Sequence, residues 1–162
     1  MLSFTASLSP NSTAFALFVT EKYDYKDAKG ILSKDITKKI DLFLKSLKEK
    51  KQKDEISSLD ISEKKKCFII KIKNKFENYY FEELGGSFFT YIKNYKTINS
   101  VDIYADSLNE NKDKLSKLFS EFIFGFNLKS YTFNKYKTLN KEKINSKVNY
   151  KIISSNKKNI EN

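Results

Sequence analysis

Hydrophobic and polar positions follow two different periods along the chain, which predicts strands interleaved with helices. Two short apolar segments, residues 2–8 and 14–20, flank a Ser-Pro-Asn-Ser turn sequence and are predicted to be strands. Residues 67–72 give the strongest strand signal, because β-branched and aromatic residues there form a compact run bounded by lysines. Further strands are indicated at residues 54–61, 98–104 and 148–153.

Two amphipathic helices are predicted from apolar residues that recur on one helical face. The first begins near Ile31 and reaches Leu47, with lysines at the positions between. The second follows Ser107-Leu-Asn-Glu110, which has the pattern of a capping box, and its apolar face continues to Phe126.

A third helix is predicted around Gly85 and Gly86. A glycine inside a helix costs about 1 kcal/mol relative to alanine, so two adjacent glycines need a structural reason. We expect these glycines to let the helix pack closely on the sheet.

Strands that alternate with helices of ten or more residues require crossover connections, which are typical of α/β proteins. The sequence therefore predicts a mixed, largely parallel sheet of about five or six strands sandwiched between helices. No internal repeat or low-complexity linker divides the chain. We expect a single α/β domain over residues 1–153 and a polar tail over residues 154–162.

The net charge of +11 raises the question of nucleic-acid binding. All 31 basic residues are lysine, however, and bidentate recognition of phosphate or guanine relies largely on arginine. The chain is also rich in other residues with AT-rich codons, so genome composition can account for the lysines. We rank solvated lysine faces above a nucleic-acid surface and keep nucleic acid as the alternative partner.

Cys67 is the single cysteine and cannot form an intramolecular disulfide. The longest apolar segment near the N-terminus, residues 14–19, is too short to span a bilayer, and no basic leader precedes it. We expect a cytoplasmic location and no membrane partner.

The absence of histidine excludes Ser-His-Asp and Cys-His arrangements and every histidine-bearing metal site. Neighbouring acidic residues are interpreted as helix-start charges or solvated loop residues rather than as acid/base pairs. These pairs are Asp24 with Asp27, Glu82 with Glu83, and Glu110 with Asp113. No catalytic, metal-binding or cofactor-binding residue is assigned in this chain.

Residues 121–138 contain the most distinctive motif. A helix is predicted to end within residues 125–130 and to be followed by an aromatic and basic connector. The motif resembles a run of the type Gly-x-x-Leu-x-Ser-Tyr-x-Phe-x-x-Tyr-Lys-Thr at the end of the N-terminal domain of leucyl aminopeptidases (cytosol aminopeptidases). The matching residues are Gly125, Leu128, Ser130, Tyr131, Phe133, Tyr136, Lys137 and Thr138. The run Glu82-Glu83-Leu84-Gly85-Gly86 is similar to a second family motif.

The resemblance implies a macro-domain-like fold and a non-catalytic N-terminal domain. It also implies that a second, catalytic domain of the same polypeptide holds two divalent ions, zinc or manganese, and releases N-terminal residues from peptides. Members of the family form homo-oligomers (hexamers). Whether the protein is an enzyme therefore depends on its parent chain, because none of the family's catalytic residues falls in this segment.

Two interpretations of the 125–138 motif remain open. Its aromatic residues can cover the end of the sheet, which we favour, or they can form with the lysines a surface that stacks bases or, as fits better, docks another domain. Macro domains bind ADP-ribose through glycine-rich loops after their strands, and residues 71–75 contain no glycine, so we expect no ADP-ribose binding. The alternatives for the whole chain are a lysine-rich nucleic-acid-binding module and a stand-alone diverged domain without enzyme activity.

Overall fold

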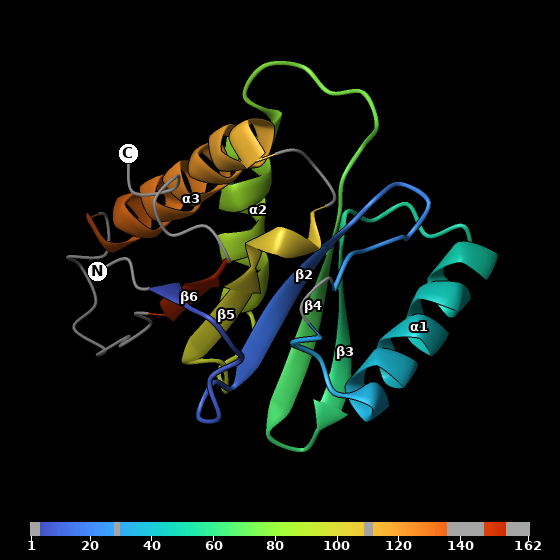
Figure 1. Cartoon of the computed structure of the whole chain (residues 1–162). Helices are drawn as coiled ribbons and strands as arrows, with labels where there is room; N and C mark the ends of the chain where they lie inside the picture. The colour runs from blue at the N-terminus through green and yellow to red at the C-terminus, as the bar shows by residue number, and fades with distance from the viewer. Residues whose placement is uncertain (1–3, 28–29, 109–111, 136–147, 155–162) are drawn as a thin grey trace.

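A mixed six-stranded sheet forms the centre of the molecule (Figure 1). The computed structural model describes residues 4–27, 30–108, 112–135 and 148–154. The strand order is β1-β6-β5-β2-β4-β3, and every neighbouring pair is parallel except β3 with β4. The strands are β1 (Phe4–Thr5), β2 (Ala14–Val19), β3 (Ile56–Ser62), β4 (Lys65–Lys71), β5 (Ser100–Tyr104) and β6 (Asn149–Ile153). The predicted mixed, largely parallel sheet is confirmed.

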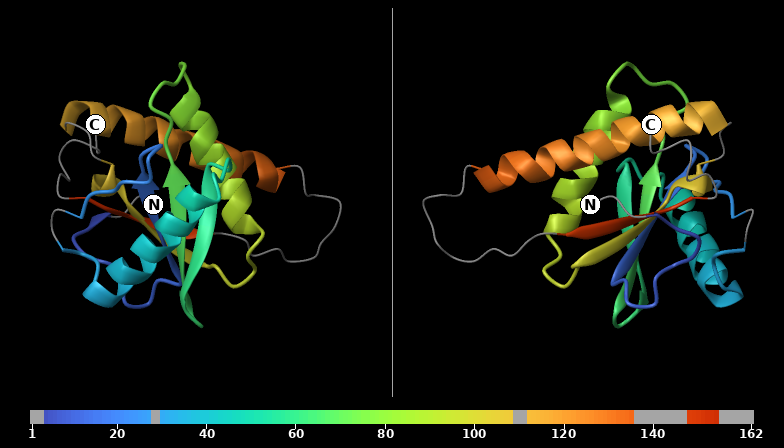
Figure 2. Two further views of the ribbon diagram at one scale, coloured as in Figure 1. Left: turned by 90° about the vertical axis from the view of Figure 1, so that its right-hand side faces the viewer. Right: turned by 60° about the vertical axis from the view of Figure 1, so that its left-hand side comes forward.

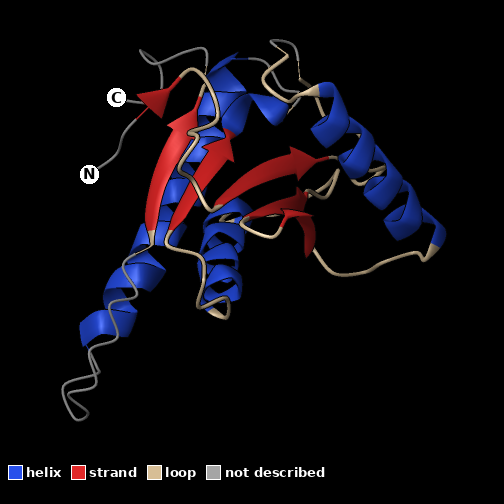
Figure 3. Ribbon diagram, turned by 90° about the horizontal axis from the view of Figure 1, so that it is seen from below, coloured by secondary structure: helices blue, strands red, loops and turns tan. Residues whose placement is uncertain are grey.

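Helices cover both faces of this sheet, as Figures 1 and 2 show. Helix α1 (Lys34–Glu49) lies on one face, and α2 (Tyr80–Lys93) and α3 (Lys112–Lys135) lie together on the other. A view from below shows the sheet between these layers (Figure 3). Strand β2 is buried at all six positions because it is covered from both sides, which explains its unbroken run of apolar residues.

The core consists of two layers, one on each face of the sheet. The layer under α2 and α3 is rich in phenylalanine, and its rings meet mostly edge to face; the Phe18 and Phe122 centroids, for example, are 5.1 Å apart. The layer under α1 is mostly aliphatic, with Ile40, Leu44 and Leu47 as the buried side chains of the helix. Cys67 lies in this second layer, and burial raises the pKa of its thiol. It behaves as a small apolar residue.

Gly85 and Gly125 are buried where helix α2 crosses helix α3. Gly85 therefore packs helix against helix, and not helix against sheet as the sequence predicted. A Cβ atom on Gly85 would lie 1.9 Å from the backbone oxygen of Phe122, and one on Gly125 would lie 1.9 Å from the backbone oxygen of Glu82. Helices α2 and α3 therefore cross with their backbones in direct contact. Gly86 is less constrained, because a Cβ there would meet its nearest atom at 3.6 Å.

Helix α3 continues through Lys135, so the predicted helix end within residues 125–130 is wrong. Gly125 does not adopt the left-handed conformation of a helix-terminating glycine; among the glycines, only Gly30 has a positive φ. Glycine is needed at position 125 for the close approach to α2. Glycine can end a helix or let two helices approach closely, and the sequence pattern alone suggested the first role.

Two further predictions need correction. Strand β1 (Phe4–Thr5) ends at Thr5, so the strand expected over residues 2–8 does not continue through residues 6–8, and residues 2–3 lie outside the described part of the chain. Ser107 is buried in a single 3-10 turn, η1 (Ala105–Ser107), and does not cap α3. Its hydroxyl donates to the Tyr104 carbonyl at 2.6 Å and accepts from the Phe18 amide at 2.8 Å, so it joins η1 to the sheet.

Within the described part of the chain, none of the helices is long and apolar enough to cross a membrane.

Candidate functional site

A hollow on the described surface lies at the free edge of β3, and we call it the β3 groove. It has a volume of about 1250 Å³. Residues 54–58, at the start of β3, form one side, and exposed positions of α2 and α3 form the other. The end of α1 closes it beyond the strand, through Phe43 and Leu47. The groove exists because β3 is an edge strand with neighbours on one side only.

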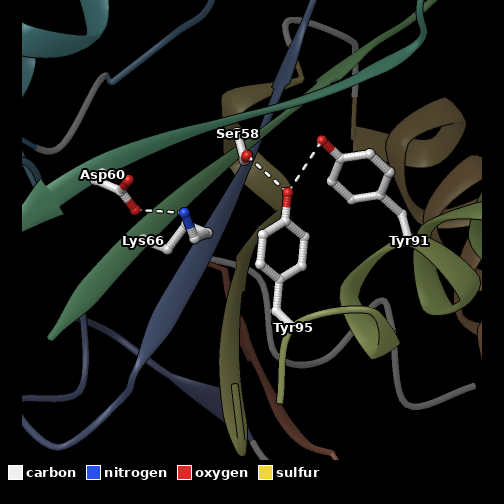
Figure 4. A network of polar contacts seen from close by, with 5 residues as sticks. All are labelled: Ser58, Asp60, Lys66, Tyr91 and Tyr95. Carbon is white, nitrogen blue, oxygen red and sulfur yellow. Dashed lines mark hydrogen bonds and ion pairs between the residues drawn. The ribbon is translucent and has the colours of Figure 1, made fainter. Parts of the chain in front are cut away.

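Three hydroxyl groups are hydrogen-bonded beneath this groove (Figure 4). The Ser58 hydroxyl of β3 lies 3.0 Å from the Tyr95 hydroxyl, which in turn donates to the Tyr91 hydroxyl of α2 at 3.4 Å. Ser58 and Tyr91 line the groove. Lys66 lies beside this network, 5.0 Å from the Tyr95 ring centre, and pairs with Asp60. The network ties the edge strand to α2 and presents polar groups to the groove.

The two tyrosines of this network differ in acidity. Burial raises the pKa of Tyr91, and so does its hydrogen bond with Tyr95. Burial would also raise the pKa of Tyr95, but its hydrogen bonds with Ser58 and Tyr91 and the Lys66 ammonium group lower it. A positive charge next to Tyr95 thus favours its ionised form, whereas Tyr91 holds its proton.

A second candidate site lies at the carboxyl ends of the central strands, because ligands of open α/β sheets bind there, where the strand order reverses. This end is occupied by the Asp27 side chain. Its carboxylate accepts hydrogen bonds from the Tyr104 hydroxyl at 2.8 Å and from the amides of Ile31 and Leu32 at 2.9 and 3.0 Å. These amides could hold a phosphate in another protein. Here they already bind an internal anion.

The surroundings of Asp27 are also internally bonded. Tyr104 is fully buried, and burial together with the Asp27 carboxylate raises its pKa. The Ser154 hydroxyl donates to the Asp106 carboxylate at 2.8 Å, which links the end of β6 to η1. The interpretation of Asp27 as a solvated loop residue is therefore wrong, since it organises the loop between β2 and α1.

Helix α3 contains the matched residues of the 125–138 motif from Gly125 to Phe133. Leu128 and Tyr131 are exposed by 48% and 68%, and Phe124, one turn earlier, is exposed by 57%. These three side chains, at positions i, i+4 and i+7, share one helical face, which we call the α3 stripe. It points away from the buried face of α3, where Phe122 and Phe126 lie in the core. Phe124 was missed by the motif comparison, although its helical spacing from Leu128 was visible in the sequence.

The other motif residues are either less exposed than Leu128 and Tyr131 or lie where side chains are not described. Gly125 contacts α2, as described above, and the Ser130 hydroxyl bonds to the Asn127 carbonyl within the same helix at 2.8 Å. Phe133 lies in the last turns of α3. Tyr136, Lys137 and Thr138 fall outside the described residues.

No cluster of three or more histidine, cysteine or carboxylate residues that could hold a metal ion occurs in the described ranges.

Comparisons with known proteins support the fold. No protein-family model matches the chain, and no curated protein matches it in sequence. Among solved structures, the macrodomain of Thermus aquaticus DarG is similar with a TM-score of 0.62 and 11% identity, covering 95% of this chain and 98% of that one. A mutant of tomato leucine aminopeptidase is similar with a TM-score of 0.63 and 10% identity, covering 99% of this chain.

The match to the aminopeptidase covers 34% of its chain, so this protein spans about a third of that enzyme's length. At 10–11% identity, these similarities show a shared fold and nothing finer about activity. The chain therefore has a macrodomain-like α/β fold, which also occurs as part of a leucine aminopeptidase.

Proposed function

We propose that this chain is the non-catalytic domain of a leucyl aminopeptidase-like protein, and that it packs against a neighbouring domain through the α3 stripe. The observation that carries the proposal is the stripe itself. Phe124, Leu128 and Tyr131 expose an apolar helical face, and two of them, Leu128 and Tyr131, match the family motif. Grouped apolar residues of this kind mark interaction surfaces in soluble proteins.

The fold adds support, because the whole chain superposes on part of an aminopeptidase of about three times its length. The family resemblance places the activity in a separate C-terminal domain with two divalent ions. In this proposal, the full polypeptide removes N-terminal residues from peptides, and the present domain contributes to assembly or to substrate access.

The proposal predicts a larger polypeptide with metal-dependent activity. Antibodies raised against the 162-residue chain should isolate that polypeptide from cells that express the gene. We expect it to hydrolyse leucyl-p-nitroanilide with manganese or zinc and to lose this activity in a chelator. The purified 162-residue chain, loaded with the same ions, serves as the control and should be inactive.

Either of two results would contradict this proposal. One is a native polypeptide no larger than the present chain. The other is a larger polypeptide that carries no metal-dependent aminopeptidase activity.

A further inference from the structure

The β3 groove combines an unpaired strand edge with negative charge. Among its described lining residues, four are carboxylates and one is a lysine: Asp54, Glu55, Glu82, Glu83 and Lys129. This composition is opposite in sign to the whole chain, whose net charge is +11. Lys73, outside the lining, pairs with Glu55 at 2.7 Å, so Asp54, Glu82 and Glu83 carry the excess negative charge of this local acidic surface.

The distribution of lysines along the sequence explains this contrast. The chain has 31 lysines among 162 residues, but none within residues 54–63 or 76–92. Both segments contribute to the groove, the first through β3 and the preceding loop, the second through α2. Lysine-free stretches of similar length also occur at residues 1–21 and 97–111, so the acidity of the groove follows from the fold, which brings these two segments together at a solvent-exposed surface.

The hydrogen-bonding pattern of β3 leaves a regular set of backbone groups free for a ligand. The Lys71 amide donates to the Glu55 carbonyl at 2.7 Å, so residues 55, 57 and 59 direct their backbone groups to β4. The alternate residues Ile56, Ser58 and Asp60 then direct their amides and carbonyls outward. Their side chains share the sheet face with α2, since the Ser58 hydroxyl contacts Tyr95.

Strand β3 also lacks the features that usually protect a sheet edge. Edge strands are commonly shielded by lysine, proline or bulges. Residues 56–60 contain neither lysine nor proline, and the register shift of this strand comes only after Asp60. An extended segment can therefore pair with about five residues before the shift ends the regular edge.

We propose that the β3 groove binds an extended, lysine- or arginine-bearing peptide segment of a partner protein as an additional strand. The backbone of this segment pairs with Ile56, Ser58 and Asp60. Its basic side chains, at alternate positions, lie on the α2 side and meet Glu82 and Glu83. Charge complementarity selects the basic segment, and the strand edge fixes its extended conformation. The groove and the α3 stripe share one residue, Leu128, on the far side of the groove from β3, but the proposal does not depend on the role proposed for the stripe.

Peptides test both parts of this proposal. The probe is acetyl-Gly-Lys-Thr-Lys-Val-Lys-Thr-Gly-amide, and its matched control replaces each lysine with glutamate. We expect the lysine peptide to bind in calorimetric titrations and the glutamate peptide to bind at least about tenfold more weakly. Equal binding of the two peptides, or no binding of the lysine peptide at about 1 mM, would overturn the proposal.

Two N-methylated versions of the lysine peptide test strand pairing. One carries methyl groups on the lysine amides, and the other carries them on the intervening threonine and valine amides. In an extended chain these two sets point to opposite edges, so only one set can face β3. We expect one methylated peptide to lose binding and the other to keep it. If methylation of the lysine amides abolishes binding, the pairing is antiparallel. If methylation of the threonine and valine amides abolishes it, the pairing is parallel. If both bind like the parent peptide, strand addition is wrong.

Substitutions in the protein provide an independent check. Ser58→Pro removes an outward amide and should abolish peptide binding, whereas Ser58→Ala keeps the amide and should bind nearly as the parent does. The double variant E82Q/E83Q should weaken the lysine peptide several-fold at low salt and leave its N-methylation pattern unchanged. If Ser58→Pro fails to fold, the methylated peptides still decide the question. A dimer of the chain that Ser58→Pro dissociates, and that the lysine peptide does not compete with, would assign the edge to a second copy and overturn the proposal.

Discussion

Replacing Gly125 with alanine should destabilise the domain by about 3 kcal/mol or more, or prevent it from folding. The new methyl group would lie 1.9 Å from the Glu82 carbonyl oxygen and less than 3 Å from two more backbone atoms of α2. Backbone atoms cannot move aside as a flexible side chain can, so the two helices would have to separate. Separation would open the phenylalanine layer between the helices and the sheet. Urea unfolding followed by circular dichroism measures the loss.

Gly86→Ala is the matched control for this experiment. It makes the same chemical change one residue beyond the crossing glycine Gly85, where the nearest atoms are at ordinary contact distances of 3.6 and 3.8 Å. Alanine favours helix over glycine by about 1 kcal/mol, so Gly86→Ala should be neutral or stabilising. Equal destabilisation by both substitutions would show that the helices do not cross at Gly125.

Asp27→Ala should lower the free energy of unfolding by about 2–4 kcal/mol. The substitution leaves the buried Tyr104 hydroxyl and the amides of Ile31 and Leu32 without their shared acceptor. Thermal or urea unfolding measures the change. Because the loop between β2 and α1 depends on these bonds, limited proteolysis should also cut the variant faster within residues 20–33.

Asp24→Ala is the control for Asp27→Ala. Asp24 lies in the same loop and carries the same charge, but it is exposed, and its backbone rather than its carboxylate makes the bonds with Thr20. We expect a change within about 0.5 kcal/mol. A similar loss of stability for the two variants would mean that charge, and not the three hydrogen bonds, explains the effect of Asp27.

The central strands could be predicted from the sequence because burial on both faces leaves a simple signal. Strand β2 is an unbroken apolar run, β4 contains the buried run 67–70, and the helix around Gly85 keeps its apolar residues on one face. The edge strand β3 gave a weaker signal, since most of its side chains are only partly buried and polar residues such as Ser57 and Ser58 occur on both of its faces. These patterns depend on local sequence and on which side of an element is buried.

The functional surfaces were harder to predict because they depend on contacts between distant segments. Gly125 looks like a helix end until Glu82 is found against it, 43 positions earlier in the chain. Asp27 looks solvated until Tyr104 is placed beside it. The β3 groove has no local motif, since its acidic residues come from two segments that only the fold brings together. The exposure of Phe124 likewise follows from how α3 is turned on the sheet.

The carboxyl ends of the central strands differ from the α3 stripe and the β3 groove in how accessible they are to a partner. The amides at the loop after β2 bind the chain's own Asp27, whereas the α3 stripe and the β3 groove remain open to solvent. Both open surfaces have the character of protein contacts, one apolar and one acidic with a strand edge. We therefore propose that this macrodomain-like fold works through protein partners.

Hydrogen–deuterium exchange tests the central claim most directly. The measurement compares the isolated 162-residue chain with the native polypeptide that contains it. The account predicts slower exchange in the native polypeptide for peptides covering residues 119–131, where the α3 stripe is buried by its neighbouring domain. Peptides from α1, which exposes Leu42 on the other face of the sheet, provide the internal reference and should exchange equally in both samples. Equal exchange of residues 119–131 in the two samples, or protection confined to α1, would contradict the account.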